Sequence, residues 1–526
     1  MPSLSSYTPN AENMNGPDGW GPLIEIIAAN DVEALEEYIE RYGLHDSRIT
    51  NGHGDMFEEA ISHGSVDVYR RFLAYQKAQA AAGIHLRLPY MPLRQACWAS
   101  QVGMVRYLLS SSDDIKALIS TQDEYGRTPL LSACTPLGHS PSKQRVQEEI
   151  VGILLDHGAS VQDRLCNGNN DPWKEDGREL YNTPLSLAMN YIGPALLRRF
   201  IDLGAPLSLP LVLEVPPQGK SYVDVTLMHI AATFVNCDAI EILLGTSEGR
   251  DMVHMRDKLG RLPIHWAANC GTHDADMIPN EETTRRAVKT MELLLPHSPV
   301  NDLDTLGNTP LHLATTFQRH SWITHNEGKE GHPPSFRNAV NHLLLDHGAD
   351  AALRNHKGDT ALGLVIATRG HPAPTALVSS LLAHGAALNE AADAEGNTPL
   401  HLAARNLPPS LDIVKFLLKR GADPTLPNAH GDTAAHMASR SQAGNYFNDV
   451  TRDIEHVLDL FEAASGAAGL CDGANNAGGT PRGVLIEEQA NLAQRIKSEE
   501  EMEMRLARGR GAYRGSYRGL GRGRGS

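Results

Sequence analysis

Apolar residues along the chain recur with the spacing of short paired helices, and polar turns rich in Gly, Asp and Asn separate the pairs. The clearest second helices are apolar runs that end on Gly-Ala, namely VGILLDHGAS (151–160), VNHLLLDHGAD (340–350), VSSLLAHGAAL (378–388) and VKFLLKRGAD (414–423). A glycine directly after such a run is typical of a helix C-cap. The pattern therefore predicts an all-α chain of helix–turn–helix units.

The start of each unit is marked by a repeated octapeptide. GNTPLHLA occurs at 307–314 and again, unchanged, at 396–403. Degenerate copies are GRTPLLSA (126–133), YNTPLSLA (181–188), DVTLMHIA (224–231), GRLPIHWA (260–267), GDTALGLV (358–365) and GDTAAHMA (431–438). The last interval between copies is 35 residues, a period that indicates a solenoid of stacked repeats.

The letters of the octapeptide have a local physical meaning. Thr309 can cap a helix and Pro310 fits its first position, where no amide hydrogen bond is lost. His312 is placed to bond back toward the cap, as Glu does in a capping box. The preceding segment 304–307 has the composition of a tight turn, with glycine tolerating positive φ. Each unit thus has an apolar face that only neighbouring units can cover.

These residues resemble the ankyrin repeat, whose signature is a Gly, then T-P-L-H, then a second helix that ends in Gly-Ala-Asp. Eight units from about 123 to 464 carry the signature, and three weaker ones precede them, which makes about eleven repeats from Trp20 to Gly466. Two units depart from it: Ala361 and Gly363 replace Pro and His in one, and Ser186 replaces His in another. The resemblance implies an ankyrin-repeat solenoid.

The remaining segments differ in composition. Insertions rich in polar residues, at 135–146, 271–283 and 317–334, are expected to be tolerated disordered loops. The predicted organisation is a disordered N-terminus (1–19), degenerate repeats (20–122), the main array (123–466), a flexible linker (467–483), an amphipathic charged helix (484–507) and a disordered tail rich in Arg and Gly (508–526).

Overall composition favours a soluble intracellular protein. The net charge of −16 disfavours general nucleic-acid binding by the body of the chain, and the six cysteines are scattered without a C-x-x-C pair. The polar N-terminus lacks the features of a signal peptide, and no stretch reads as a membrane span. We expect residence in the cytoplasm, the nucleus or both, with no membrane contact, no cofactor, no metal and no small-molecule substrate.

Motifs that could carry catalysis lack the context they need. GTSEG (245–249) matches the nucleophile elbow around Ser247, but a predicted helix precedes it where that motif requires a strand. Cys134 and Cys270 are expected to be small packing residues on first helices. His320, His325 and His332 share one insertion without tight ligand spacing. Histidines that recur at one repeat position favour packing over catalysis: His229, His265, His312, His401 and His436. The chain is therefore predicted not to be an enzyme.

The C-terminal tail has a chemistry of its own. Residues 505–526 hold seven arginines and no acidic residue, so they contribute +7 and leave −23 for residues 1–504. The tail resembles the RG-rich segments of RNA-associated proteins, and a purely solubilising tail is the open alternative. The tail could also rest on the acidic body. Its candidate nucleic-acid contacts are Arg508, Arg510, Tyr513, Arg514, Tyr517, Arg518, Arg522 and Arg524.

The resemblance implies a non-enzymatic scaffold that binds protein partners through its turns and its first helices, and the alternative is an RNA-associated adaptor that combines the tail with the array. Candidate partner contacts lie just before and after each turn glycine: Tyr125, Arg127, Leu259, Arg261, Leu306, Asn308, Lys357, Asp359, Glu395, Asn397, His430 and Asp432. Alanine at the first four of these is expected to spare folding and weaken binding. Leu311 and Leu400 are expected to belong to the repeat core.

Overall fold

The computed structural model describes residues 20–42, 56–80, 91–112, 114–135, 141–166, 181–215, 220–269, 281–316, 335–367, 374–406, 411–440, 447–466 and 469–487. Over these residues eleven helix pairs follow one another along the chain. The first helices are α1 (Trp20–Ala29), α4 (Met56–His63), α6 (Pro92–Trp98), α9 (Pro129–Cys134), α11 (Pro184–Ala188), α13 (Leu227–Thr233), α16 (Pro263–Ala268), α18 (Pro310–Thr315), α20 (Ala361–Ala367), α22 (Pro399–Arg405) and α24 (Ala434–Ser439).

The second helices are generally longer. They are α2 (Val32–Tyr42), α5 (Val66–Ala80), α7 (Val102–Ser111), α10 (Pro141–Asp156), α12 (Pro194–Asp202), α14 (Cys237–Leu244), α17 (Glu281–Leu294), α19 (Ser335–Asp346), α21 (Thr375–Ala383), α23 (Leu411–Lys419) and α25 (Phe447–Ser465). The described residues also form two short helices, α8 (Ile115–Ser120) and α15 (Ser247–Met252), and two 3₁₀ turns, η4 (Leu295–His297) and η6 (Leu470–Asp472).

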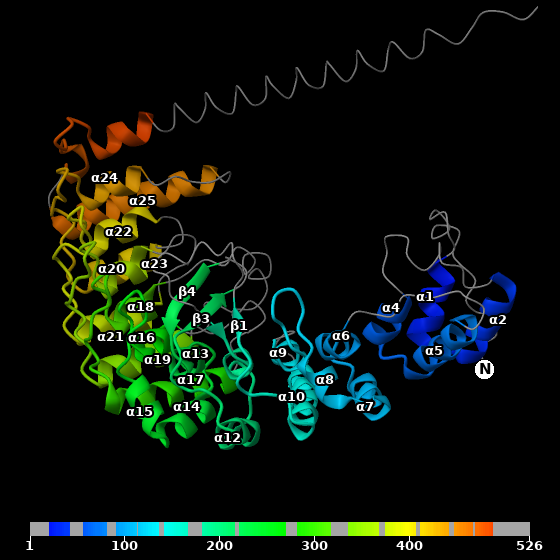
Figure 1. Cartoon of the computed structure of the whole chain (residues 1–526). Helices are drawn as coiled ribbons and strands as arrows, with labels where there is room; N and C mark the ends of the chain where they lie inside the picture. Colours follow the sequence, from blue (N-terminus) through cyan, green and yellow to red (C-terminus); the bar gives the residue numbers. More distant parts are fainter. Residues whose placement is uncertain are drawn as a thin grey trace, which may run out of the picture. The chain divides into compact units, whose positions relative to one another are not determined.

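The repeats divide into two compact units. Unit 1 comprises residues 1–299 with 320–336, and unit 2 comprises residues 300–319 with 337–526. Within unit 1, α1, α4, α6, α9 and α11 pack in chain order, as do α13 and α16; within unit 2, the same holds for α18, α20, α22 and α24 (Figure 1). Within each unit, repeats are therefore covered by their neighbours in the chain, and the prediction of an all-α repeat solenoid is confirmed.

The local signals in the octapeptide produce the expected helix starts. The Thr309 hydroxyl accepts a hydrogen bond from the amide of His312, and Pro310 occupies the first turn. Thr128 caps α9 in the same way. Leu311 and Leu400 are each 1% exposed, so they belong to the core as predicted. Helices of five to seven residues are too short to be stable alone. The caps fix where these helices begin, and packing against neighbouring repeats stabilises them.

A small sheet interrupts the helical pattern of unit 1. Strands β1 (Leu165–Cys166), β2 (Tyr181–Asn182), β3 (Leu211–Val215) and β4 (Lys220–Val225) lie in the order β1-β2-β3-β4. The pairs β1–β2 and β3–β4 are antiparallel, whereas β2 and β3 are parallel. Two successive turns have thus been replaced by strand pairs that lie side by side (Figure 1). The helical prediction missed this sheet, although LVLEV is rich in strand-forming residues.

The segment predicted as a flexible linker is instead ordered over residues 469–487. Cys471 of η6 is fully buried, and its thiol lies 3.8 Å from the Leu458 carbonyl oxygen of α25. Gly469 and Gly478 have φ values of +89° and +80°, so these glycines supply tight turns rather than flexibility. A further helix begins at Pro481 and is described through residue 487.

Two predicted insertions are shorter than expected, because α10 begins at Pro141 and α17 at Glu281, within segments 135–146 and 271–283. The insertion at 317–334 lies outside the described residues, as do the N-terminus at 1–19, residues 488–507 of the predicted charged helix and the tail at 508–526.

Candidate partner-binding surface on the turns

Seven five-residue turns share one hydrogen-bonding plan, and we call them fingers: 123–127, 257–261, 304–308, 355–359, 393–397, 428–432 and 475–479. In the finger at 304–308, the Asp304 carboxylate accepts hydrogen bonds from the amides of Leu306 and Asn308, both at 2.8 Å. An Asp or Asn at the same place does this in the other six: Asp123, Asp257, Asn355, Asp393, Asn428 and Asn475. A buried or half-buried side chain therefore fixes each finger from inside.

The fingers of unit 2 are also joined to one another. The amide of His356 donates to the Leu306 carbonyl at 2.9 Å, and the Asn355 side chain donates to that of Asn308 at 3.0 Å. The same pair of bonds links fingers 393–397 and 428–432. Gly307 allows this approach, because a Cβ there would lie 2.8 Å from the His356 nitrogen. Fingers 304–308 and 355–359 therefore form one joined pair, and 393–397 and 428–432 form another.

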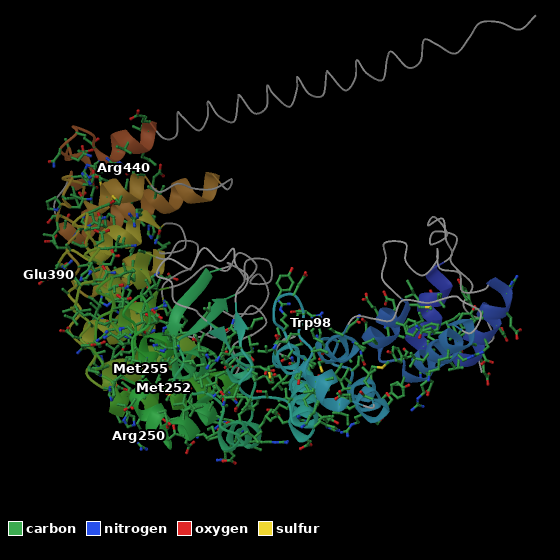
Figure 2. All side chains as sticks on the ribbon, in the orientation of Figure 1. Trp98, Arg250, Met252, Met255, Glu390 and Arg440 are labelled. Carbon is green, nitrogen blue, oxygen red and sulfur yellow. The ribbon has the colours of Figure 1, made fainter. Side chains whose placement is uncertain are left out.

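The residue before the glycine is exposed in all six fingers predicted to bind partners. Tyr125, Leu259 and Leu306 are 58%, 40% and 49% exposed. Lys357, Glu395 and His430 occupy the same position and are also exposed. Met255, labelled in Figure 2, adds a 39% exposed apolar side chain two residues ahead of Asp257. Large apolar side chains held in water at equivalent positions are typical of a binding surface.

The residue after the glycine behaves differently, and here the predicted contact set needs correction. Arg127 is exposed, with its guanidinium carbon 5.5 Å from the Tyr125 ring centroid. Asn308 and Asp359 are half-buried. The remaining three are buried and hold the fingers together: Arg261, Asn397 and Asp432. The chain has already turned back under the finger at this position, so its side chain points to neighbours inside the array.

Arg261 is the clearest of the buried cases. Its Nη2 lies 2.5 Å from an Asp257 carboxylate oxygen, and that oxygen also accepts a hydrogen bond from the Trp266 indole at 3.1 Å. The guanidinium carbon lies 4.1 Å from the centroid of the Trp266 ring. Both charged side chains are shielded from solvent, so neither can be removed without leaving the other uncompensated.

Asp432 is likewise committed within unit 2. Its carboxylate accepts hydrogen bonds from the Asn475 side chain at 2.6 Å and from Arg440, labelled in Figure 2, at 2.5 Å. Burial alone would raise the pKa of Asp432, but these two hydrogen bonds outweigh it and hold the pKa below its usual value. Asp432 thus binds the anchor of the finger at 475–479, and its carboxylate is not left exposed for a protein partner.

The recurring histidines connect consecutive repeats. The Thr309 amide donates to His312 Nδ1 at 3.2 Å, so that nitrogen must be the unprotonated one. His312 Nε2 therefore carries the proton and donates to the Asp359 carbonyl of the next finger at 3.2 Å. We call this arrangement the histidine bridge. It recurs at His229, His401 and His436, whose Nε2 atoms lie 3.0, 2.9 and 3.1 Å from the carbonyls of Arg261, Asp432 and Gly479.

The repeat that begins at Thr360 has Gly363 in place of this histidine, and a direct backbone hydrogen bond joins it to the next repeat. At Gly363 a Cβ would lie 2.5 Å from the Ala392 oxygen, so no side chain fits there. The Thr360 amide donates directly to the Ala392 carbonyl at 3.0 Å. The segment that leads into the following finger is one residue longer than its counterparts and contains the exposed Glu390 (Figure 2). In the other departure, the Ser186 hydroxyl completes the capping box of Thr183.

Burial determines the protonation of the bridge histidines. It lowers the pKa of His229 to about 4 and lowers the pKa values of His312, His401 and His436 below 6.5. Hydrogen bonds to the finger carbonyls oppose this shift without cancelling it. The neutral ring is the form that fits both partners, since a second ring proton would face the amide of the capping Thr.

The motifs considered for catalysis have structural roles. Ser247 begins α15, directly after helix α14, and its hydroxyl donates to Glu248. The motif glycine, Gly249, is required because a Cβ there would clash with the Leu243 carbonyl. Cys134 is buried, and burial raises the pKa of its thiol far above the usual range. Cys270 and the histidines at 320, 325 and 332 lie outside the described residues.

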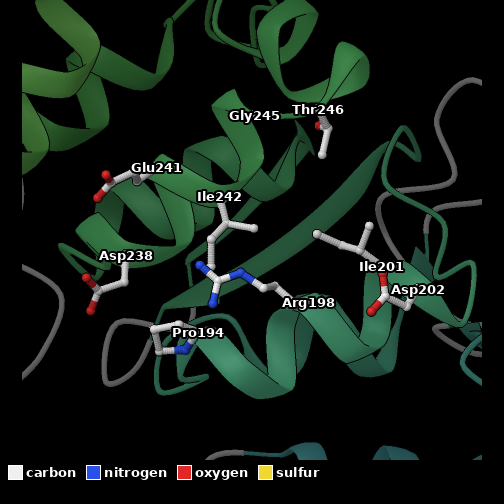
Figure 3. Close-up of a pocket in the computed structure, with 9 residues that line it drawn as sticks. All are labelled: Pro194, Arg198, Ile201, Asp202, Asp238, Glu241, Ile242, Gly245 and Thr246. Carbon is white, nitrogen blue, oxygen red and sulfur yellow. The ribbon is translucent and has the colours of Figure 1, made fainter.

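A groove of about 480 Å³ lies between α12 and α14 (Figure 3). Arg198 of α12 reaches across it toward α14, whose Asp238 and Glu241 line the opposite side. The lining contains no histidine or cysteine, and the hydroxyl of its Thr246 donates to the Leu243 carbonyl. Its residues therefore include no paired nucleophile and base.

Within the described ranges, no three His, Cys, Asp or Glu side chains gather as metal ligands would. None of the helices described is both long and apolar enough to cross a bilayer. The eight tail residues predicted to contact nucleic acid, Arg508, Arg510, Tyr513, Arg514, Tyr517, Arg518, Arg522 and Arg524, lie beyond the described residues.

The signal that sequence reasoning missed is the Asp or Asn three residues before each finger glycine. It accounts for the buried or half-buried anchor of every finger described, and Asn475 with Gly478 shows the same spacing inside the supposed linker. No sequence pattern indicates the burial of Arg261. Its guanidinium lies against the indole of Trp266, which is five residues later in the chain and belongs to helix α16.

Replacing Arg261 by Ala is predicted to lower the free energy of unfolding by about 3–5 kcal/mol, because Asp257 would remain buried without its partner. Arg127→Ala, at the equivalent exposed position, should change it by less than about 0.5 kcal/mol. Urea unfolding followed by circular dichroism compares the two variants. Equal losses of stability would mean that Arg261 is not held as described.

Stability is predicted to fall in acid through the bridge histidines. Unfolded His229 binds a proton near pH 6.5, whereas the folded ring does so only near pH 4. Its contribution is present above pH 6.5 and is lost as the pH falls toward 4, by about 3 kcal/mol in total. His229→Gln should lose less stability than the native chain between pH 7.5 and 4.5. The exposed-site control His254→Gln should keep the native pH dependence, and a His229→Gln variant that did the same would contradict the assignment.

Known proteins share parts of this repeat pattern. Residues 227–324 and 335–428 match the family described as ankyrin repeats (3 copies). The chain is 33% identical over 168 residues to intracellular phospholipase A2 of Caenorhabditis elegans, over 30% of this chain and 14% of that protein. It is 33% identical over 135 residues to human BCL-6 corepressor-like protein 1, over 26% of this chain and 7% of that protein.

A third relative is inversin of Canis lupus familiaris, with 26% identity over 214 residues that cover 38% of this chain and 18% of inversin. The chain spans less than a fifth of the length of each of these relatives. The matched residues include His229, His312 and His401 and the fingers at 257–261, 304–308, 355–359 and 393–397. With these features in place, the repeats over residues 227–324 and 335–428 are ankyrin repeats.

Proposed function

We propose that the chain is a non-enzymatic adaptor that binds a protein partner through the tips of its fingers, with Tyr125, Leu259 and Leu306 as the main contacts. The single observation that carries this proposal is the 40–58% exposure of these apolar side chains at one equivalent position in three fingers. Ankyrin repeats act as protein-interaction modules, which supports a protein rather than a small molecule as the ligand.

The composition of the tips supports a protein partner as well. Aromatic residues and arginine are enriched at the energetic centres of protein interfaces, and the stacked pair of Tyr125 and Arg127 supplies both. Leu303 and Leu306 lie on either side of the anchor Asp304, and both are exposed. Because the finger backbone is already hydrogen-bonded, these tips can bind without a large ordering cost.

The partner set also needs to be smaller than the twelve residues suggested by sequence. Arg261, Asn397 and Asp432 are excluded from direct contact by burial. Lys357, Glu395 and His430 remain as polar rim positions in unit 2. An adaptor built this way needs no nucleophile, and the helical context of Ser247 supports the absence of hydrolase chemistry, even though one relative is named as a phospholipase.

Combined Tyr125→Ala, Leu259→Ala and Leu306→Ala is predicted to abolish capture of the partner while leaving the melting temperature and the helical circular dichroism unchanged. The measurement is affinity capture of the tagged full chain followed by mass spectrometry. Leu203→Ala is the matched control, since Leu203 is 50% exposed but follows the second helix α12. If both variants captured the same proteins as the native chain, the finger tips would not be the binding surface.

RNA binding through the tail is a second candidate function, favoured by the seven arginines and the absence of acidic residues in 505–526. If all seven reached phosphates of a single strand, the logarithm of affinity against that of salt concentration would have a slope near about −5. Titration of single-stranded RNA with the full chain and with 1–504 measures this. Loss of binding in 1–504 is the expected result, and equal binding by both would remove the tail from this role.

A further inference from the structure

The last described residues form the beginning of a twelfth repeat. Asn475 accepts hydrogen bonds from the amides of Ala477 and Gly479 at 3.0 and 2.9 Å, as the anchor residues of the other fingers do. The histidine bridge from the preceding repeat ends on the Gly479 carbonyl. A first helix then starts at Pro481, directly after Thr480, and is described through residue 487. Within the described residues, no second helix follows it.

Ile486 shows what this repeat lacks. It is the sixth residue after Thr480 and is 65% exposed. The equivalent residue of an earlier repeat, Ile366, is the same side chain and is 1% exposed. Burial at this position is general, since the equivalents are all between 0% and 6% exposed: Cys134, Ala232, Ala268, Thr315, Ala404 and Ser439. Ile486 therefore occupies a core position without its cover.

The neighbouring position indicates which cover is missing. The second residue after the cap is a buried apolar side chain in other repeats, such as Leu311 and Leu400, but here it is Arg482. Arg482 forms ion pairs with Glu462 and Asp472 and remains half exposed. A further repeat or a second copy stacked end to end would bury this charge network at a large cost. A second helix of the same repeat would cover Ile486 and leave the ion pairs of Arg482 in solvent.

The chain continues directly into a segment with the right pattern. Leu492 and Ile496 are four residues apart, which places them on one face of a helix. Three residues separate α6 from α7 and α13 from α14. Helices α6 and α13 are each seven residues long. A first helix of that length from Pro481, followed by the same three-residue return, would place the start of a second helix at 491, with Leu492 and Ile496 in its first two turns. Leu506, fourteen residues after Leu492, returns to the same face about four turns later.

We propose that residues 488–507 of the same chain form the second helix of the twelfth repeat and pack Leu492 and Ile496 against Ile486. This helix closes the C-terminal end of the array. It also fixes where the RG-rich tail begins, since Arg508 follows it directly. The segment is then part of the folded array rather than a separate docking helix for partners.

The test is hydrogen–deuterium exchange on the full chain, read in peptides from 481–487 and α25. Leu492→Asp with Ile496→Asp should speed exchange there by about tenfold or more, because the cover of Ile486 is lost. The matched control is Gln494→Asp with Ser498→Asp, which adds the same charge at the same spacing on the opposite face. Unchanged exchange in α18, α20 and α22 verifies that the rest of unit 2 stays folded.

A reciprocal variant tests the contact itself. Ile486→Asp should speed exchange in the same peptides, and adding it to the Leu492→Asp, Ile496→Asp pair should change nothing further, since all three remove one contact. Unchanged exchange in the Leu492→Asp, Ile496→Asp variant would overturn the proposal, because Ile486 would then be uncovered in the native chain. A dimer by light scattering that this variant dissociates would also overturn it, by assigning the cover to a second copy.

Discussion

The histidine bridge is the interaction on which the order of the array depends. One imidazole accepts from the amide of its own capping Thr and donates to a finger carbonyl of the next repeat, as His401 does with Thr398 and Asp432. It therefore satisfies a helix terminus and a turn at the same time, in a place that water does not reach. Both bonds require a neutral ring, and burial lowers the pKa of His401 and so favours that neutral form.

The bridge acts together with the anchor residues, which hold all seven fingers whose plan is described. An anchor residue holds each finger from inside, and a histidine of the preceding repeat also holds the fingers at 257–261, 355–359, 428–432 and 475–479. In unit 2, finger 304–308 is joined to 355–359, and 393–397 to 428–432. The side chain ahead of the glycine is exposed in six fingers, although that of Glu395 also accepts a hydrogen bond from Asn397 and pairs with Arg405. Its identity can change from Leu306 to Lys357 or Glu395 without disturbing the fold. Binding specificity can thus vary at positions that stability does not constrain.

Most of the fold could be predicted from sequence, because its signals are local. Thr309, Pro310 and the finger glycines determine helix starts and turns through their own conformational preferences. The burial of Arg261 and Asp432 was not predictable in this way, since it depends on partners supplied by tertiary packing. The segment around Asn475 was misjudged because glycine-rich composition suggests flexibility, while the positive φ of Gly478 serves a tight turn. The sheet was missed because its strands replace turns without disturbing the helical repeats on either side.

The direct test of the histidine bridge is the tautomeric state of its rings, measured by nitrogen NMR of the full chain labelled at histidine. At neutral pH, His229, His312, His401 and His436 should each show an unprotonated Nδ1 and a protonated Nε2, because a backbone amide faces the first and a carbonyl the second. Signals typical of the opposite tautomer, or of rings that average between the two, would contradict the bridge.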